Sequence, residues 1–221
     1  TTRKGKRSGM AEIQPLYTVD DAFQCLQQFR SVPYAEDLLP VPGLRVRFQE
    51  AGHILGSSVL EIWGEENGKT EKLLFTGDLG QPEQPIIRDP AIIETADYII
   101  SESTYGNRNH EQYDKESRLA EIVNETVERG GNIIIPAFAV GRTQTLLYHF
   151  YKLWKAGRIP EIPVVIDSPL AISATNIFFN NIQDFDEETK SLMRGGKLLE
   201  LPQLRFVHTA DESKALNEDL Q

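Results

Sequence analysis

The sequence predicts a mixed fold, with a β-rich first half and a second half of α/β type. Three observations indicate this. Residues 44–50 alternate apolar and polar side chains, which is the period of a half-buried strand. Residues 58–78 read as two strands joined at Asn67-Gly68, a strong hairpin signal. After about residue 106, helical and strand patterns alternate, as they do in doubly wound α/β domains.

The remaining elements can be placed in order along the chain. A short helix is expected over residues 18–30, because Thr18 suits the N-cap and Asp20 and Asp21 lie in the first turn. Residues 96–104 read as a strand that ends in polar side chains. The second half is expected to contain helices at about 114–129 and 141–156, strands at 132–138 and 163–167, a third helix from Pro169 and a last helix over 212–221. No strand follows that last helix, so the second half is expected to stop before its sheet is complete.

Composition narrows the class of protein. The 221 residues are 40% hydrophobic and 25% charged, which suits one or two globular domains. Apolar stretches reach only about ten residues where a membrane span needs roughly 20, so no contact with a membrane interior is expected. The net charge of −10 argues against nonspecific binding of duplex DNA by the whole surface. This net charge is still compatible with a locally basic cleft that binds a single nucleic-acid strand.

Cysteine usage and the first residues point to a cytoplasmic chain that is part of a longer one. Cys25 is the only cysteine, which excludes an internal disulfide and a Cys-rich zinc site. Its position in a helical pattern predicts a small core residue, and such usage fits the cytoplasm. The opening TTRKGKRSGM has no secretory core and no initiator Met at position 1, so an internal fragment or a processed product is expected.

Three candidate site residues follow predicted strands. His53 in AGHILGSS lies between glycines after a strand, and neutral imidazole is a good zinc ligand. Asp78 in LLFTGDLG lies at an exposed tip, where one carboxylate can bridge two divalent ions. Glu102 in SESTYGNR can orient a histidine or hold a water beside a metal. Each residue alone is more often structural, but His, Asp and Glu at three strand ends together indicate a metal-centred site.

A fourth motif, PAFAVGRTQTLL, suits phosphate. An apolar run ends in a small-residue loop, and a helix begins near Arg142 and Thr143. A helix N-terminus offers free N–H groups, and Arg142 can add a bidentate contact. Asp167 and Ser168 follow the next strand, where they either face the same cleft or cap a helix. The candidates for binding a substrate phosphate are therefore Arg142, Thr143 and Ser168, and the alternative is ordinary β-α connections.

Taken in order, AGHILGSS, LLFTGDLG, SESTYGNR, PAFAVGR and DSPLA resemble the β-CASP branch of the metallo-β-lactamase superfamily over nearly the whole chain. The chain is most similar to bacterial and archaeal homologues of the eukaryotic pre-mRNA 3′-end endonuclease. The resemblance implies the last part of an αββα metallo-β-lactamase domain over residues 1–110, then the first part of a Rossmann-like β-CASP domain over residues 111–221. It also implies that His53 is a zinc ligand, that Asp78 bridges two zinc ions and that Glu102 supports a catalytic histidine.

The family's HxHxDH motif, which supplies most zinc ligands, does not occur in this sequence. The two later β-CASP histidines have no counterpart either, because His110, His149 and His208 lie in other contexts. The resemblance thus implies a middle segment of a two-zinc hydrolase that cleaves single-stranded RNA. A catalytic zinc usually needs three protein ligands, so this segment alone is expected to hold zinc weakly and to be inactive.

Other functions stay open at this point. A metallo-β-lactamase-type hydrolase of a non-RNA substrate is disfavoured, because small-molecule members lack the α/β second half. A non-catalytic β-CASP subunit that binds RNA is disfavoured by the retained His53, Asp78 and Glu102. A nucleotide-binding domain would be expected to carry GxGxxG or GxxxxGK[ST], and neither string occurs. Incomplete sheets expose strand edges, so self-association or docking with a complementary fragment is also expected.

Overall fold

The computed structural model describes residues 15–109, 113–194 and 201–219, and the chain separates into two compact units, residues 1–33 and 34–221. In the first unit, α2 (Val19–Leu26) begins as predicted. Thr18 forms a capping box with Asp21, in which each side chain accepts the backbone N–H of the other residue. The prediction that Cys25 is a core residue is wrong, since the thiol is exposed. Residues 15–33 contain no second helix or strand that could cover it.

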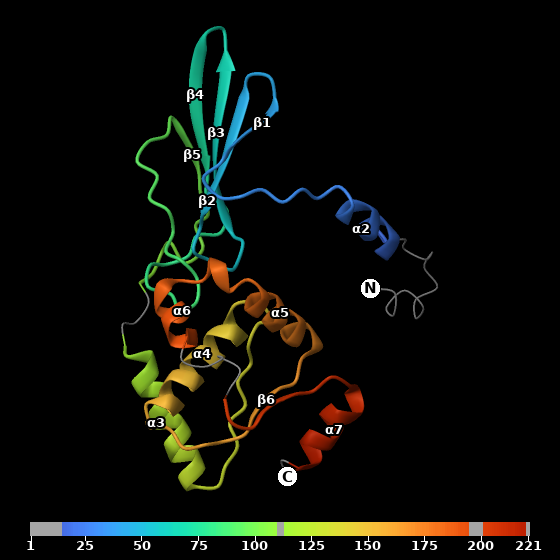
Figure 1. Ribbon diagram of the computed structural model, residues 1–221, viewed down its shortest axis with the longest axis vertical. Helices are drawn as coiled ribbons and strands as arrows, with labels where there is room; N and C mark the ends of the chain where they lie inside the picture. Colours follow the sequence, from blue (N-terminus) through green and yellow to red (C-terminus); the bar gives the residue numbers. More distant parts are fainter. Residues whose placement is uncertain (1–14, 110–112, 195–200, 220–221) are drawn as a thin grey trace. The chain divides into compact units, whose positions relative to one another are not determined.

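The second unit contains a five-stranded sheet in the order β1-β2-β3-β4-β5 (Figure 1). The strands are β1 (Asp37–Val41), β2 (Leu44–Glu50), β3 (Ser58–Glu66), β4 (Lys69–Phe75) and β5 (Tyr98–Ile100). Strands β1 to β4 are antiparallel, and β5 runs parallel to β4. The predicted hairpin turns at Asn67 and Gly68, both with positive φ, as a tight hairpin turn requires.

The helices of this unit follow β5, together with a separate sheet of two parallel strands. They are α3 (Lys115–Glu128), α4 (Arg142–Lys155), α5 (Pro169–Asn180), η1 (Ile182–Asp184), α6 (Glu187–Arg194) and α7 (Ala210–Asp219), and the strands are β6 (Val164–Ile166) and β7 (Leu204–Phe206). The mixed α/β class is therefore confirmed, and the described residues form two separate sheets. The division into family domains at residue 110 stays a prediction. None of the described helices is long and apolar enough to cross a membrane.

Helix α4 lies at the centre of the larger hydrophobic core. It buries five apolar side chains there, Leu147, Tyr148, Phe150, Tyr151 and Leu153. These pack with buried residues of α3, β6 and α5, such as Val123, Ile166 and Ile172. Because this one helix is anchored so heavily, the position of its N-terminus is fixed by the core.

The predicted strand at residues 132–138 is wrong, because the structure has no strand there. Ile134 and Phe138 are 83% and 84% exposed. An apolar run favours a strand, but a strand forms only where a neighbour accepts and donates its backbone hydrogen bonds. In the described part of the chain, β6 pairs with β7, and neither pairs with residues 132–138.

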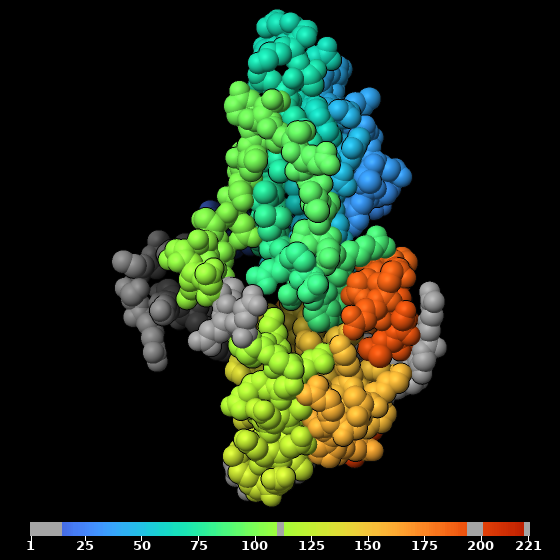
Figure 2. Space-filling view, turned by 90° about the vertical axis from the view of Figure 1, so that its left-hand side faces the viewer, coloured from blue at the N-terminus to red at the C-terminus, as the bar shows by residue number. Residues whose placement is uncertain are grey.

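One loop, which we call the strap (residues 79–91), lies between β4 and β5 in the sequence and contacts both the sheet and the helices. At its ends, Gly80 N–H donates to Ala51 O at 2.8 Å and Ala91 N–H donates to Glu50 O at 2.8 Å. Between them Ile86 enters the core of the helices. Figure 2 shows the strap, in green, against the orange segment that precedes and begins α6.

Three contacts fasten the middle of the strap to that segment. Ile86 N–H donates to Thr189 Oγ1 at 3.1 Å, and Asp186 N–H donates to Ile86 O at 2.9 Å. Arg88 Nη2 donates to Gln183 O at 2.8 Å. Ile86 has φ +82°, which is unfavourable for a β-branched residue, so these contacts hold a strained backbone in place.

Candidate functional site

The loop that carries His53 is tightly closed. Ser57 Oγ accepts the N–H groups of His53 and Ile54 at 3.1 and 3.2 Å, and Glu50 Oε1 accepts Gly52 N–H at 2.8 Å. The strap packs directly on this loop, since a Cβ on Gly80 would lie 1.6 Å from Gly52 O. Only glycine fits there, and the close approach fixes the path of the backbone on both sides of His53.

The structure brings His53, Asp78 and Glu102 together. His53 Nε2 lies 3.7 Å from Asp78 Oδ2, and both side chains are open to solvent. Glu102 Oε1 accepts the N–H of Leu79, next to Asp78, at 2.5 Å. Glu102 N–H in turn donates to Thr76 Oγ1 at 3.4 Å, which ties the ends of β4 and β5 together. The loop after β2 and the ends of β4 and β5 thus meet at one place.

Glu102 is held as a carboxylate. The hydrogen bond from Leu79 N–H lowers its pKa most, and Thr104 and the nearby His53 lower the pKa further. At neutral pH Glu102 is therefore an acceptor that can hold the N–H of a histidine ring, as the resemblance implies.

The His53–Asp78 pair fits part of a zinc site. Two ligands of one tetrahedral zinc, each at about 2.1 Å, lie roughly 3.4 Å apart, close to the 3.7 Å found here. No group of three or more His, Cys, Asp or Glu side chains within residues 15–109, 113–194 and 201–219 is placed to hold a metal. His110 lies outside the described residues. The binding of zinc by His53 and Asp78 stays a prediction.

The N-terminus of α4 lies against the His53 loop. A Cβ on Gly141, the N-cap of α4, would lie 3.3 Å from Ile54 Cγ2. Arg142, the first residue of the helix, is exposed, and its guanidinium makes no ion pair or hydrogen bond with the described residues. The structure therefore leaves the predicted phosphate ligand Arg142 available beside this loop.

Two other predicted phosphate ligands already have structural roles. Thr143 Oγ1 donates to Phe138 O at 2.8 Å and closes the turn before α4. Ser168 Oγ accepts Ala171 N–H at 3.2 Å, so Ser168 is the N-cap of α5. The capping role was one of the two readings of Ser168, and the binding of phosphate by Thr143 or Ser168 stays a prediction.

Sequence reasoning missed the strap and one buried amide. Gln144 is 1% exposed, and its Nε2 donates to Thr175 Oγ1 at 2.8 Å and to Ala139 O at 3.1 Å. This side chain joins the loop before α4 to α5 and so fixes the direction in which α4 begins. A polar residue inside an amphipathic helix pattern gives no local signal of such a role.

Comparison with known proteins agrees with this architecture. Residues 143–221 match the Beta-Casp domain. The matched residues are part of a Beta-Casp domain, and the chain as a whole resembles the β-CASP branch of the metallo-β-lactamase superfamily. It is 34% identical over 206 residues to Ribonuclease TTHA0252 of Thermus thermophilus. The aligned residues make up 92% of this chain and 46% of that protein.

Two further relatives have other names. The chain is 38% identical over 144 residues to the transcription termination factor FttA of Methanosarcina mazei, covering 61% of this chain and 22% of that protein. It is 30% identical over 190 residues to cleavage and polyadenylation specificity factor 73 of Drosophila melanogaster, covering 84% and 27%. The chain thus spans less than half the length of each of these relatives.

Proposed function

We propose that the protein to which this chain belongs is a zinc-dependent ribonuclease that hydrolyses phosphodiester bonds of single-stranded RNA. One observation carries this proposal. His53 and Asp78 lie 3.7 Å apart beside the ionised Glu102, in a chain similar over 92% of its length to a protein named as a ribonuclease. We also propose a cytoplasmic location, because the exposed thiol of Cys25 stays reduced there.

The residues of the chain have separate roles in this proposal. His53 and Asp78 would hold the zinc, and Asp78, 77% exposed, would have room to contact a second ion. When bound there, zinc would supply a hydroxide at neutral pH and would stabilise charge on the phosphate. Glu102 orients a histidine through its carboxylate, and Arg142 holds a phosphate oxygen of the RNA backbone.

The described residues of this chain lack the third ligand that a catalytic zinc usually has. We therefore propose that the remaining ligands come from the part of the longer protein that this chain does not span, and that the 221-residue chain alone is inactive.

The same incompleteness suggests a docking surface. Strand β5 is at the edge of its sheet, and its apolar side chains Tyr98, Ile99 and Ile100 are all more than half exposed. An apolar strand with a free edge is a template for another strand. We propose that the complementary part of the protein pairs here, and that isolated chains pair with each other when that part is absent.

The activity test uses the full-length protein with zinc and a labelled single-stranded RNA. Asp78→Ala is expected to lower the cleavage rate by at least about 100-fold, because it removes a shared ligand, and Glu102→Gln by about 10–100-fold. The control is Asp211→Ala, which removes an exposed carboxylate of α7 that makes a local ion pair with Lys214.

Two outcomes would contradict the proposal. Full activity in Asp78→Ala would show that the metal assignment is wrong. Zinc-loaded protein that binds the RNA without cleaving it would favour a non-catalytic β-CASP subunit instead.

A further inference from the structure

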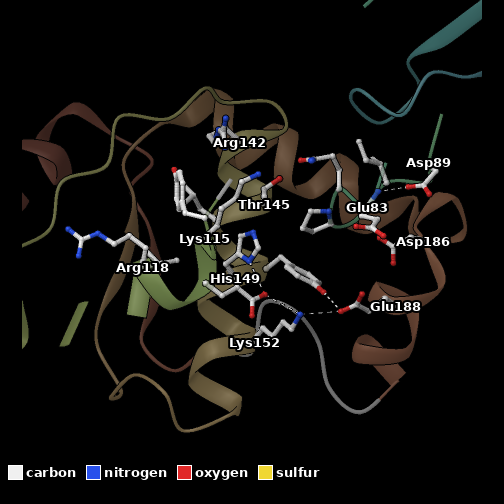
Figure 3. Close-up of a pocket in the computed structure, with 18 of the residues that line it drawn as sticks. Glu83, Asp89, Lys115, Arg118, Arg142, Thr145, His149, Lys152, Asp186 and Glu188 are labelled. Carbon is white, nitrogen blue, oxygen red and sulfur yellow. Dashed lines mark hydrogen bonds and ion pairs between the residues drawn. The ribbon is translucent and has the colours of Figure 1, made fainter. Parts of the chain in front are cut away.

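A pocket of about 710 Å³ lies beside α4 (Figure 3). Its walls are the first turns of α3, one side of α4, the strap, and the segment that begins α6. The volume is in the range of sites that hold small molecules. None of His53, Asp78 and Glu102 lines it, so it is separate from the candidate metal site.

The two sides of the pocket carry opposite charges. Figure 3 shows Lys115, Arg118 and Arg142 on one side, and four carboxylates on the other, namely Glu83, Asp89, Asp186 and Glu188. The basic side comes from α3 and α4, and two of the four carboxylates come from the strap. A ligand with a phosphate at one end and hydroxyl donors at the other would match this arrangement.

Part of this charge is already neutralised at one end of the pocket. Lys152 Nζ lies 3.1 Å from Glu116 Oε1 and 3.2 Å from Glu188 Oε1. Tyr148 OH donates to Glu188 at 2.9 Å, and His149 Nδ1 lies 3.3 Å from Glu116 Oε1. These groups satisfy one another, so they form a structural wall and are not the groups that would recognise a ligand.

The groups at the other end have few partners among the described residues. The side chains of Lys115, Arg142 and Glu83 make no ion pair or hydrogen bond with any residue that the structure describes. Asp89 Oδ1 accepts Glu83 N–H at 2.7 Å, which leaves its second oxygen open. The Tyr113 ring, 60% exposed, also lines the pocket, and an aromatic face is a platform on which a base can stack.

We propose that this pocket binds one ribonucleotide unit, with the phosphate at Lys115 and Arg142, the ribose hydroxyls at Glu83 and Asp89, and the base against Tyr113. This inference rests on the proposed function, because RNA supplies such units. Carboxylates accept hydrogen bonds from ribose hydroxyls, and the 2′-hydroxyl distinguishes RNA from DNA. The overall charge of −10 repels phosphate in general, so binding depends on these local cations.

The test measures binding to the 221-residue chain by calorimetry, with EDTA present to remove metal. The probes are uridine 5′-monophosphate, its 2′-deoxy analogue, inorganic phosphate and a 5′-phosphorylated tetrauridylate. We expect the ribonucleotide to bind about 10-fold more tightly than the deoxy analogue, since a hydrogen bond to a carboxylate is lost. A tetrauridylate that binds more tightly than the mononucleotide identifies an RNA strand as the ligand, and equal binding identifies a free nucleotide.

Three variants assign the effect to the pocket. Lys115→Gln is expected to weaken binding of every phosphate-bearing probe about 3- to 10-fold, with a smaller loss at high salt. Glu83→Gln is expected to reduce the preference for ribose and to leave phosphate binding unchanged. The control Lys155→Gln changes a lysine of α4 that packs on Tyr151 outside the pocket, and it is expected to bind like the parent chain.

The outcomes separate this inference from the proposed function. Equal binding of ribose and deoxyribose probes, or unchanged binding in Lys115→Gln, would overturn the pocket even if the full-length protein cleaves RNA. Conversely, ribose-selective binding that Lys115→Gln weakens would support the pocket even if the full-length protein does not cleave RNA.

Discussion

His149 is a residue whose protonation should act on stability. It is half-buried on α4, facing Glu116 and Lys115 of α3 and Lys152 of α4. Burial lowers its pKa more than the Glu116 carboxylate raises it. The unfolded chain therefore binds the proton first, so stability is complete above a pH of about 6.5 and falls as pH drops toward the lower folded pKa.

The corresponding prediction compares the chain with His149→Gln. The free energy of unfolding of the parent chain is expected to fall relative to that of the variant between about pH 6.5 and pH 5. Urea titrations at several pH values measure this difference. If the difference in the free energy of unfolding between the two proteins does not change with pH, the Glu116 carboxylate raises the pKa of His149 as much as burial lowers it.

The residues of the candidate site show what sequence can and cannot reveal. Asp78 and Glu102 could be predicted to meet, because they follow β4 and β5, which turn out to be parallel neighbours. The order of the sequence motifs added His53 to the predicted site. The contact between Ile86 and Thr189 could not be predicted, because it joins residues 103 positions apart and neither residue type marks a site.

At the scale of elements, the start of α4 depends on Gly141. This residue has φ +81°, and an added Cβ would lie 3.3 Å from Ile54 Cγ2. Gly157, after the other end of α4, has φ +66° with nothing within 4 Å. Gly157→Ala is therefore expected to cost about 1–2 kcal/mol through backbone strain alone.

Gly141→Ala is expected to cost more than Gly157→Ala, because it adds a close contact with the His53 loop to a similar backbone strain. Denaturant unfolding of both variants gives the comparison. Equal losses would mean that the His53 loop yields freely and that α4 does not hold it.

Local patterns identified the elements that satisfy their own hydrogen bonds. The hairpin at Asn67-Gly68 and the helix start at Thr18 follow from turn and cap chemistry. Strand β1 was missed because Pro40 argues against a strand, although an edge strand tolerates proline. Residues 132–138 were assigned a strand wrongly because pairing depends on a neighbour that the local sequence does not show.

The strap depends on one buried hydroxyl. Thr189 Oγ1 accepts Ile86 N–H and donates to Asp186 Oδ2 at 3.0 Å, and Thr189 is fully buried. Thr189→Val keeps the shape but leaves the Ile86 N–H without a partner, so it is expected to cost about 1–3 kcal/mol. Thr189→Ser keeps the hydroxyl and should retain the protection of the Gly80 and Ile86 amides against hydrogen exchange. Thr189→Val should lose this protection, so both amides should exchange faster in that variant. Unchanged protection in Thr189→Val would show that the strap is held elsewhere.

At the scale of the whole molecule, the open edge of β5 sets the tendency to associate. Ile99→Lys places a charge on this edge and is expected to reduce self-association of the isolated chain, measured by sedimentation over a range of concentrations. Ile92→Lys makes the same change at an exposed site outside any strand and serves as the control. Equal effects of the two variants would mean that general hydrophobicity, not the strand edge, drives association.

The long reach of the strap also has a consequence for the timing of synthesis. Its partner Thr189 is translated 103 residues after Ile86. At about 5–20 residues per second, roughly 5–20 seconds pass before the ribosome has made both halves of this contact. During that interval the ends of the strap can already bond to Ala51 and Glu50, but its middle lacks the partner that holds the strained backbone at Ile86. A nascent chain should therefore be unable to fix the middle of the strap until the start of α6 has left the ribosome.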